Sequence, residues 1–199
     1  SYHKDKFGFH LNVDVNYDIF WGEYEGKRCP IDDFLSDTVD MKIYGITVKT
    51  LPIEKAFVQL VLHHYKEMNS LYHFTRHNTI RTEMFRDIYD MLEKNCCQLN
   101  LNIIQDICVY YMIGVYVYYM LYYTNLIFKS DILTEYIEKI DYYRNDEVLG
   151  SYGLSSKERK KWRISFDSRL DNDNIWYNIK DDLTSLDAKK ITNNKFIFD

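Results

Sequence analysis

The stretch "LPIEKAFVQLVLHHYKEM" (residues 51–68) decides the fold of this chain, because it reads as a long helix with a defined start. Pro52 fits the first turn of a helix, where its missing N–H is not needed, and Glu54 follows where the helix dipole favours an acid. Apolar side chains recur at helical spacing, at Ile53, Phe57, Val58, Leu60, Val61, Leu62 and Met68. We expect this helix to lie at the centre of the fold.

Three further helices are expected after it. The segment "TEMFRDIYDMLEKN" (82–95) carries an apolar stripe and has Thr82 as its expected N-cap. A third helix is predicted to begin near Leu101 and to continue through residue 128. The segment "SDILTEYIEKIDYY" (130–143) predicts a fourth, with Ser130 as its cap.

The chain before residue 51 has the pattern of strands. From Phe7 to Ile19 every odd position is apolar, and nearly every even position is polar, so this segment is expected to be a half-buried strand. "MKIYGITVKTL" (41–51) predicts two short strands separated at Gly45. The expected fold is therefore α+β and predominantly helical, with a small antiparallel or mixed sheet at the N-terminus packed against about four helices.

Composition divides the chain into three parts. Residues 1–50 are expected to form the sheet, 51–143 a helical domain and 144–199 a polar C-terminal extension. In the extension, "KERKKWR" (157–163) concentrates basic residues around one tryptophan. Such a run is either a phosphate-facing patch or, as we expect here, the solvated face of a helix.

Charge and cysteine content limit the classes of function. The formal net charge of −5 argues against a broad basic surface for nucleic acid. The cysteines, at positions 29, 96, 97 and 108, have no C-x-x-C spacing, which predicts reduced thiols and a cytoplasmic location. No signal-peptide pattern opens the chain, and it begins at Ser1 rather than Met, as a fragment of a longer protein does.

Residues 107–128 raise the question of a membrane span. The segment has 22 residues without a charge, which is long enough to cross a bilayer. Seven of them are tyrosine, however, and tyrosine hydroxyls prefer the membrane interface to the bilayer centre. We therefore expect a helix buried on most sides within the protein, with a membrane span as the alternative.

Asp14 is the best candidate for metal chemistry in the opening strand. Its neighbours on the same face are Asn12 and Asn16, each about 6.5–7 Å along the strand. A carboxylate flanked by amides suits Mg²⁺, which takes oxygen ligands. Asp18, about 13 Å away, is too far to share the ion. The alternative is an ordinary solvated strand face.

The histidines give no recognised metal motif. His63 and His64 point about 100° apart on a helix, and H-E-x-x-H is absent from the sequence. His64 is expected to be a core histidine with one hydrogen-bonded partner. Asp87, at the border of a buried stripe, is expected to cap or to pair, with Arg81 or His64, rather than to catalyse. Dinucleotide, P-loop and serine-hydrolase motifs are also absent.

The order of "VDVNYDIFW", "ITVKTLPIEKAFVQLVLHHY" and "RTEMFRDIYDML" resembles the uncharacterised nucleotidyltransferase-like family (family 5) of the polymerase-beta nucleotidyltransferase superfamily. Members carry an Asp-x-His-Trp-like strand, a Leu-(Ser/Pro)-x-Glu helix start, a Leu-x-x-His helix and a later Arg-Asp-Ile/Leu helix. The similarity covers about residues 7–143, and its motifs are short.

The resemblance implies a two-metal nucleotidyl transfer site. Asp14 matches the third acid of the superfamily, a ligand to the Mg²⁺ that activates the acceptor hydroxyl, and Asn16 stands where the family usually has His. Asn12 and Asn16 would line the nucleotide. Residues 1–50 would then be a partial nucleotidyltransferase-like sheet, and the substrates would be a nucleoside triphosphate and an unknown hydroxyl acceptor.

The sequence departs from the family in one respect. No Gly-Ser turn followed by Asp-x-Asp on a strand occurs in these 199 residues. Either the chain is the C-terminal portion of a longer enzyme, or a protein partner supplies that half. Whether the chain is an enzyme therefore stays open. The alternative function is a non-catalytic helical module that binds a protein or peptide through a Tyr-rich groove.

Overall fold

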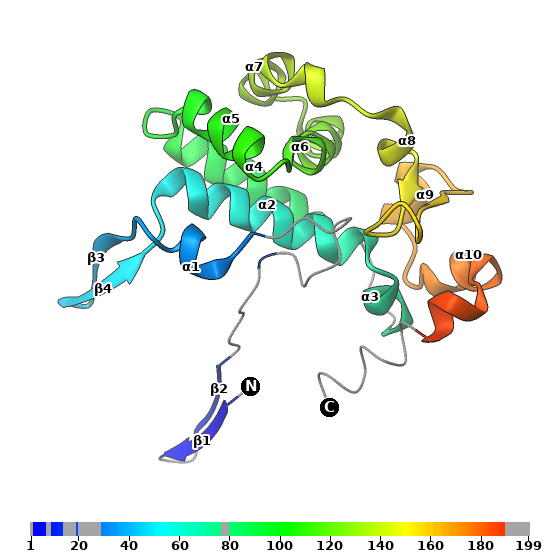
Figure 1. Cartoon of the computed structure of the whole chain (residues 1–199), viewed down its shortest axis with the longest axis horizontal. Coiled ribbons are helices and arrows are strands. Elements are labelled where there is room, and N and C mark those ends of the chain that lie inside the picture. The colour runs from blue at the N-terminus through cyan, green and yellow to red at the C-terminus, as the bar shows by residue number, and fades with distance from the viewer. Residues whose placement is uncertain (1, 7–8, 14–18, 20–28, 77–79, 190–199) are drawn as a thin grey trace.

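The structure is a computed structural model that describes residues 2–6, 9–13, 19, 29–76 and 80–189, with backbone alone for 2–13. Helices dominate it, which confirms the predominantly helical α+β class (Figure 1). The helices are α1 (Ile31–Phe34), α2 (Ile53–Asn69), α3 (Leu71–Thr75), α4 (Thr82–Asn95), α5 (Leu101–Tyr110), α6 (Gly114–Phe128), α7 (Asp131–Lys139), η1 (Asp141–Tyr143), α8 (Asp146–Leu149), α9 (Phe166–Leu170), α10 (Trp176–Ile179) and η2 (Lys180–Asp182).

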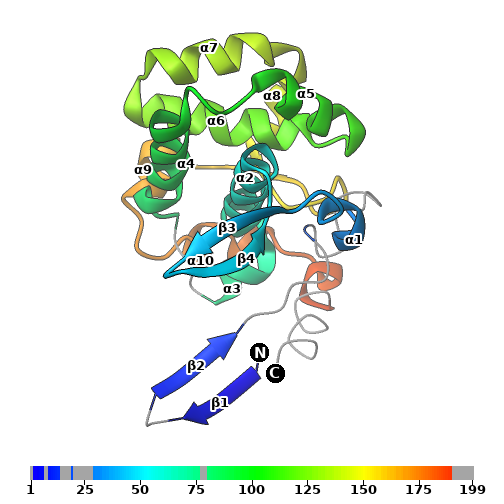
Figure 2. The same cartoon turned by 90° about the vertical axis from the view of Figure 1, so that its left-hand side faces the viewer.

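The strands pair as separate hairpins rather than as one sheet. They are β1 (Tyr2–Lys6), β2 (Phe9–Val13), β3 (Val39–Ile43), β4 (Ile46–Thr50), β5 (Ser151–Tyr152) and β6 (Lys160–Lys161). Within the described residues they form three two-stranded antiparallel sheets. Of the strand predicted from Phe7 to Ile19, the described part is β2, and residues 14–18 lie outside the description. Both views show the β1–β2 hairpin apart from the helices (Figure 2).

The β3–β4 hairpin confirms the turn predicted at Gly45. Tyr44 and Gly45 connect the strands and both have positive φ, 49° and 82°. The two-residue turn whose twist matches that of a β-hairpin requires positive φ at both of its central residues. Glycine adopts this conformation without strain.

Helix α2 is central, as its sequence predicts. It begins directly after Pro52, and its apolar face is buried, including Phe57, Val61 and Met68 at 0% exposure. It packs against α4, α5 and α6. Figure 2 shows α7, α6 and α2 as successive layers. Burial of large apolar side chains on each facing surface, at about 25 cal/mol per Å², supplies most of the energy that holds these layers together.

The predicted helix starts are correct to within one residue. Ser130 occupies the N-cap position of α7, although its side chain makes no capping hydrogen bond. Thr82 is wrong as the N-cap of α4, because it is already the first helical residue and Arg81 precedes it in extended conformation. Glu83 in the first turn of α4 is favoured by the helix dipole.

The single helix predicted from Leu101 through residue 128 is wrong, because the chain breaks between α5 and α6. Met112 adopts a left-handed φ of 55°. The N–H of Ile113 donates to the Cys108 carbonyl at 3.0 Å, and the N–H of Met112 donates to the Val109 carbonyl at 3.2 Å. This is the Schellman arrangement that ends many helices. The break divides the uncharged segment between two helices.

Helix α6 is the buried helix that its sequence predicts. Tyr116, Tyr118, Tyr119 and Tyr123 are each at most 5% exposed, and they pack among α2, α4 and α7. In the part of the chain that the structure describes, no helix combines the length and apolar character needed to cross a bilayer. These four tyrosines therefore contribute to the core.

Residues 144–189 pack onto the helices. Tyr123 of α6 donates to the Leu149 carbonyl at 2.6 Å and receives a hydrogen bond from the Arg169 guanidinium at 3.1 Å. Arg169 is 3% exposed, and its guanidinium lies 4.7 Å from the centre of the Trp162 ring and 5.2 Å from that of Phe166. Cation–π contacts of this kind offset part of the cost of burying the charge.

Candidate functional site

The residues predicted to bind Mg²⁺ and nucleotide are largely outside the described part of the chain. Asp14 and Asn16 fall in the undescribed segment 14–18. Asn12 lies on β2, where its backbone is opposite that of His3. The predicted Mg²⁺ site at Asp14 therefore stays a prediction.

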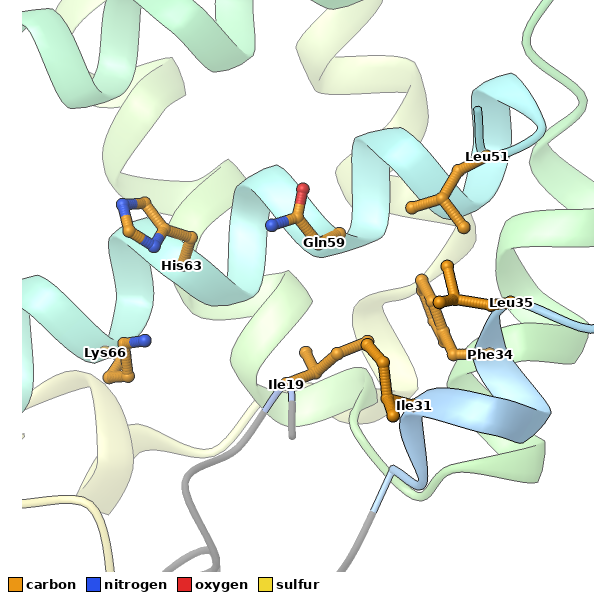
Figure 3. Close-up of a pocket in the computed structure, with 8 residues that line it drawn as sticks. All are labelled: Ile19, Ile31, Phe34, Leu35, Leu51, Gln59, His63 and Lys66. Carbon is orange, nitrogen blue, oxygen red and sulfur yellow. The ribbon is translucent and has the colours of Figure 1, made fainter. Parts of the chain in front are cut away.

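A pocket of about 270 Å³ lies between α1 and α2. Its lining residues are Ile19, Ile31, Phe34, Leu35, Leu51, Gln59, His63 and Lys66. Figure 3 shows the apolar side chains of α1 and Leu51 at one end and the polar side chains of His63 and Lys66 at the other. A mainly apolar cavity with a few polar groups at one end is typical of a small-molecule site, although this volume is at the low end of the range for such sites.

Helix α1 is fixed over this pocket by side chains from two other parts of the chain. Lys55 on α2 donates to the Phe34 carbonyl at 3.0 Å and pairs with Asp37. The Tyr111 hydroxyl donates to Asp33 at 2.8 Å. Burial and this hydrogen bond raise the pKa of Tyr111 well above its usual range. The pocket wall is thus held by polar contacts as well as by the packing of Phe34 against Tyr111.

A cluster of titratable side chains lies on α2 where His63 meets the pocket. Glu67 lies between two imidazoles, with Oε1 3.6 Å from His63 Nε2 and Oε2 3.4 Å from His64 Nδ1. The other nitrogen of His64, Nε2, lies 3.4 Å from Oδ2 of Asp87 on α4. His64 therefore has a carboxylate beside each ring nitrogen.

The predicted burial of His64 and the predicted pairing of Asp87 with it are confirmed. His64 is 6% exposed and hydrogen-bonds with Glu67, as a core histidine with a partner does. Asp87 pairs with His64, which was one of its two predicted partners. Asp87 lies at the border of the buried stripe, as predicted, but its side chain is 58% exposed rather than buried. The reason is that Asp87 lies at the edge of α4 and reaches His64 from the solvent side.

Burial sets the charge state of this cluster. Burial, and then nearby cations, lower the pKa of His63, although Glu67 opposes the shift. Burial lowers the pKa of His73, the next histidine along the chain, to about 4. The hydrogen bond from His64 lowers the pKa of Glu67. At neutral pH, His63 and His73 are therefore neutral and Glu67 is ionised.

Glu67 is the member that the sequence reasoning missed. The sequence did contain a signal for Glu67. Residues three and four apart on a helix are neighbours, and Glu67 has these spacings from His64 and His63. The contribution of Asp87 from another helix has no such local signal.

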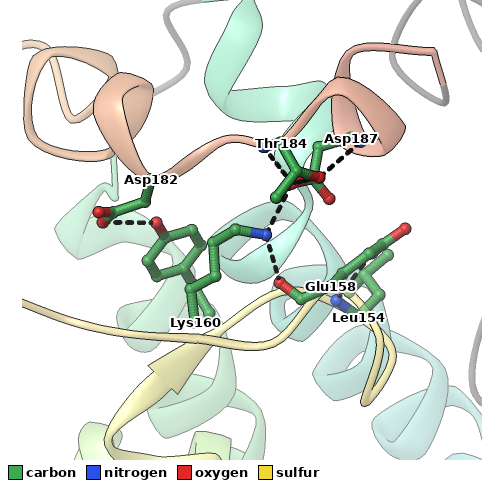
Figure 4. Close-up of polar contacts among 7 residues, drawn as sticks. Leu154, Glu158, Lys160, Asp182, Thr184 and Asp187 are labelled. Atoms are coloured by element: carbon green, nitrogen blue, oxygen red, sulfur yellow. Dashed lines mark hydrogen bonds and ion pairs between the residues drawn. The ribbon is translucent and has the colours of Figure 1, made fainter.

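The basic run at 157–163 is not the helix face that was predicted. It forms a turn followed by β6. Lys160 donates to Asp187 at 2.8 Å and to the Glu158 carbonyl at 3.2 Å, as Figure 4 shows. Arg163 pairs with Asp182. Two of its five basic residues are thus paired with acids from later in the chain, which reduces the positive charge that this run could offer a phosphate.

Asp187 is the buried member of this second polar cluster. It is 3% exposed and accepts hydrogen bonds from Lys160 and from the N–H and hydroxyl of Thr184, both at 2.7 Å. Burial alone would raise the pKa of Asp187, but the hydrogen bonds from Lys160 and Thr184 outweigh it and lower the pKa. The Asp187 carboxylate is hydrogen-bonded by Lys160 and Thr184 of the same fold, so we assign this cluster a structural role.

Comparisons with known proteins gave no match to a family model, to a curated protein or to a solved structure.

Proposed function

We propose that this chain is the distal part of a nucleotidyltransferase-like protein, which transfers a nucleotidyl group to a hydroxyl acceptor with Mg²⁺. In this proposal Asp14 is the metal ligand and Asn12 and Asn16 line the nucleotide. The half with the Gly-Ser turn and the Asp-x-Asp pair is supplied by preceding sequence or by a partner. The thiols, all free in the structure, favour a reducing location such as the cytoplasm.

The position of Ile19 is the observation that carries the proposal. Ile19 ends the strand predicted to hold Asp14, and it lines the pocket on α2. Ile19 is five positions along the chain from Asp14. In this proposal the α1–α2 pocket, which Ile19 lines, holds the acceptor.

Contacts between the resembling segments give further support. Glu54, from the Leu-Pro-x-Glu helix start, accepts a hydrogen bond from the Asn100 N–H at 3.0 Å. His64 and Asp87, from the helices resembling the Leu-x-x-His and Arg-Asp-Ile motifs, pair with each other. The second and third of the resembling segments are thus in direct contact through His64 and Asp87, which favours reading those two as parts of one unit.

Thermal unfolding with ATP, GTP, CTP and UTP, each with and without Mg²⁺, tests this proposal. A nucleotide at ten times its Kd should stabilise the chain by about 1.4 kcal/mol, or about 3–6 °C in Tm, only when Mg²⁺ is present. Asp14→Asn should abolish the shift, whereas Asp18→Asn, the same change on the same predicted strand face, should retain it. Equal shifts in both variants would contradict binding at Asp14, and no shift with any nucleotide would contradict nucleotide binding by this chain.

A second candidate, a non-catalytic protein-binding module, is favoured by the β3–β4 hairpin. The cross-strand pairs Val39–Thr50, Met41–Val48 and Ile43–Ile46 form one largely apolar face. Met41 is 47% and Ile46 67% exposed. Among the described residues this sheet has two strands, and exposed apolar strands of such a sheet are suited to an extended apolar peptide that adds a strand.

Site-specific crosslinking distinguishes this candidate. A photoreactive residue at position 43, on the apolar face, should capture a discrete protein partner, whereas the same residue at position 42, on the opposite face, should not. Asp14→Asn should leave the capture unchanged. Equal capture from both positions would count against a docking face on this hairpin.

A further inference from the structure

We propose that His63, His64 and Glu67 bind a Zn²⁺ ion on α2, with Asp87 holding the His64 imidazole in place. This site is separate from the Mg²⁺ site proposed at Asp14 and does not depend on it. Its ligands are imidazole nitrogens and one carboxylate, which suit zinc and other first-row transition metals rather than Mg²⁺.

The distances within the cluster fit a tetrahedral ion. The three candidate ligand atoms all lie within 4.8 Å of one another. Glu67 is 3.4 Å from His64 and 3.6 Å from His63. Zinc bonds of about 2.0–2.1 Å place tetrahedral ligands about 3.3 Å apart, so small side-chain movements would bring these atoms into coordination.

Asp87 lies beside the nitrogen of His64 that would not bind the ion. In the structure Nδ1 of His64 hydrogen-bonds with Glu67, and Nε2, 3.4 Å from the Asp87 carboxylate, makes no hydrogen bond. An ion bound at Nδ1 would replace that hydrogen bond and move the proton to Nε2, where Asp87 is placed to accept it. Zinc-binding histidines commonly donate their other N–H to a carboxylate, which fixes the tautomer and the ring orientation. The contact with Asp87 is thus the arrangement that such a site needs.

The environment also suits a cation. Lys66, 4% exposed, is the nearby cation that opposes binding, and the carboxylates of Glu67 and Asp87 outnumber it.

The position of His63 gives the ion access to the pocket. Its side chain is 46% exposed and lines the α1–α2 pocket. Three protein ligands leave the fourth position of a tetrahedral zinc ion open, as in catalytic rather than structural zinc sites. That position would hold water or a ligand that enters from the pocket.

Direct titration of the tag-free chain with ZnCl₂, after EDTA treatment and in competition with a chromophoric chelator, tests the site without any nucleotide. Four further histidines, at positions 3, 10, 73 and 77, could also bind zinc, so variants must make the assignment. The same titration with Co²⁺ should give the visible absorption of a four-coordinate ion.

His63→Gln and Glu67→Gln should each abolish the tight binding and the Co²⁺ spectrum. Asp87→Asn should weaken binding by about 10–100-fold, because it removes only the group that orients a ligand. His73→Gln, a change at a neighbouring histidine outside the cluster, should leave binding unchanged. His63 is half exposed, so its variant is expected to fold, and circular dichroism checks this.

The proposal is overturned if the wild-type chain binds zinc no more tightly than the double variant of His63 and Glu67. It is also overturned if His73→Gln removes binding as fully as His63→Gln does. Failure here would leave the test of Asp14 with nucleotide and Mg²⁺ unaffected, because the two experiments use different metals and different variants.

Discussion

Replacement of Gly153 by alanine should destabilise the fold strongly, and the structure gives two independent reasons. Gly153 has a φ of 100°, which side chains other than glycine rarely adopt. A Cβ at this position would lie 2.6 Å from the carbonyl oxygen of Glu158 and 2.9 Å from the N of Arg159. Both are backbone atoms, so no side-chain rotation relieves the contact. The Gly153 N–H also donates to the Asn69 carbonyl at the end of α2, at 2.9 Å.

The expected cost is the sum of two terms. Unfavourable backbone conformation at a residue with positive φ costs about 1–2 kcal/mol. Overpacking against fixed atoms adds about 1–3 kcal/mol. The total of about 2–5 kcal/mol is a large fraction of the 5–15 kcal/mol that stabilises a typical domain. For a chain of this size it corresponds to a decrease in Tm of about 4–20 °C.

Urea unfolding followed by circular dichroism measures this loss, and Gly45→Ala is the matched control. Gly45 also has a positive φ, 82°, but no atom lies within 4 Å of its added Cβ. This variant should therefore lose only the conformational term. Similar losses for the two variants would refute the reasoning, because they would show that the region around Glu158 moves away at no cost.

Three further outcomes follow from buried groups. Asp187→Asn should lower the free energy of unfolding by about 3–5 kcal/mol in urea titrations, because it leaves the Lys160 ammonium without its buried counter-ion, and a loss below about 1 kcal/mol would contradict this. Ellman's reagent should modify the exposed Cys96 and Cys97 rapidly and the two buried thiols only on unfolding. The pKa of His73 is about 4, below its unfolded value, so stability should decrease as pH falls from 6.5 toward 4, by up to about 1.4 kcal/mol per pH unit. His73→Gln should reduce that slope, and an unchanged slope would contradict the lowered pKa.

Local sequence signals predicted the long helices well. The apolar stripes of 82–95 and of the segment after Pro52 gave α4 and α2 with nearly correct bounds, because each helix buries one face on a shared core. The hairpin at Gly45 was likewise specified by its own turn residue.

The break between α5 and α6 had no such signal. Left-handed helix ends usually carry glycine, whereas here Met112 takes that conformation and Gly114 comes two residues later. Gly114 instead allows the close approach of the Tyr143 ring, because a Cβ added at Gly114 would lie 2.4 Å from that ring. The end of α5 is therefore decided by tertiary packing around Ile113 and Tyr143 rather than by local preference.

The candidate sites also combine contacts that follow from local spacing in the sequence with contacts that depend on the tertiary fold. The spacing of His63, His64 and Glu67 on one helix could be deduced from the sequence, because neighbours on a helix surface follow from its period. The contact of Asp87 with His64 was predicted only as one of two alternatives, and the pairing of Lys160 with Asp187 joins segments whose approach depends on the whole fold. The periodicity of a single sequence does not encode such approaches.

The buried position of Arg169 bears on how fragments of this chain should be prepared. Because its guanidinium lies against Tyr123 of α6, a polypeptide that stops before α9 leaves an aromatic recess open on that helix. We expect such a truncated chain to self-associate into mixed species rather than to form one defined species. A separately made peptide covering residues 144–189 should bind it and cover the recess. Residue 143 is thus an unsuitable place to end a recombinant fragment, although the composition changes there.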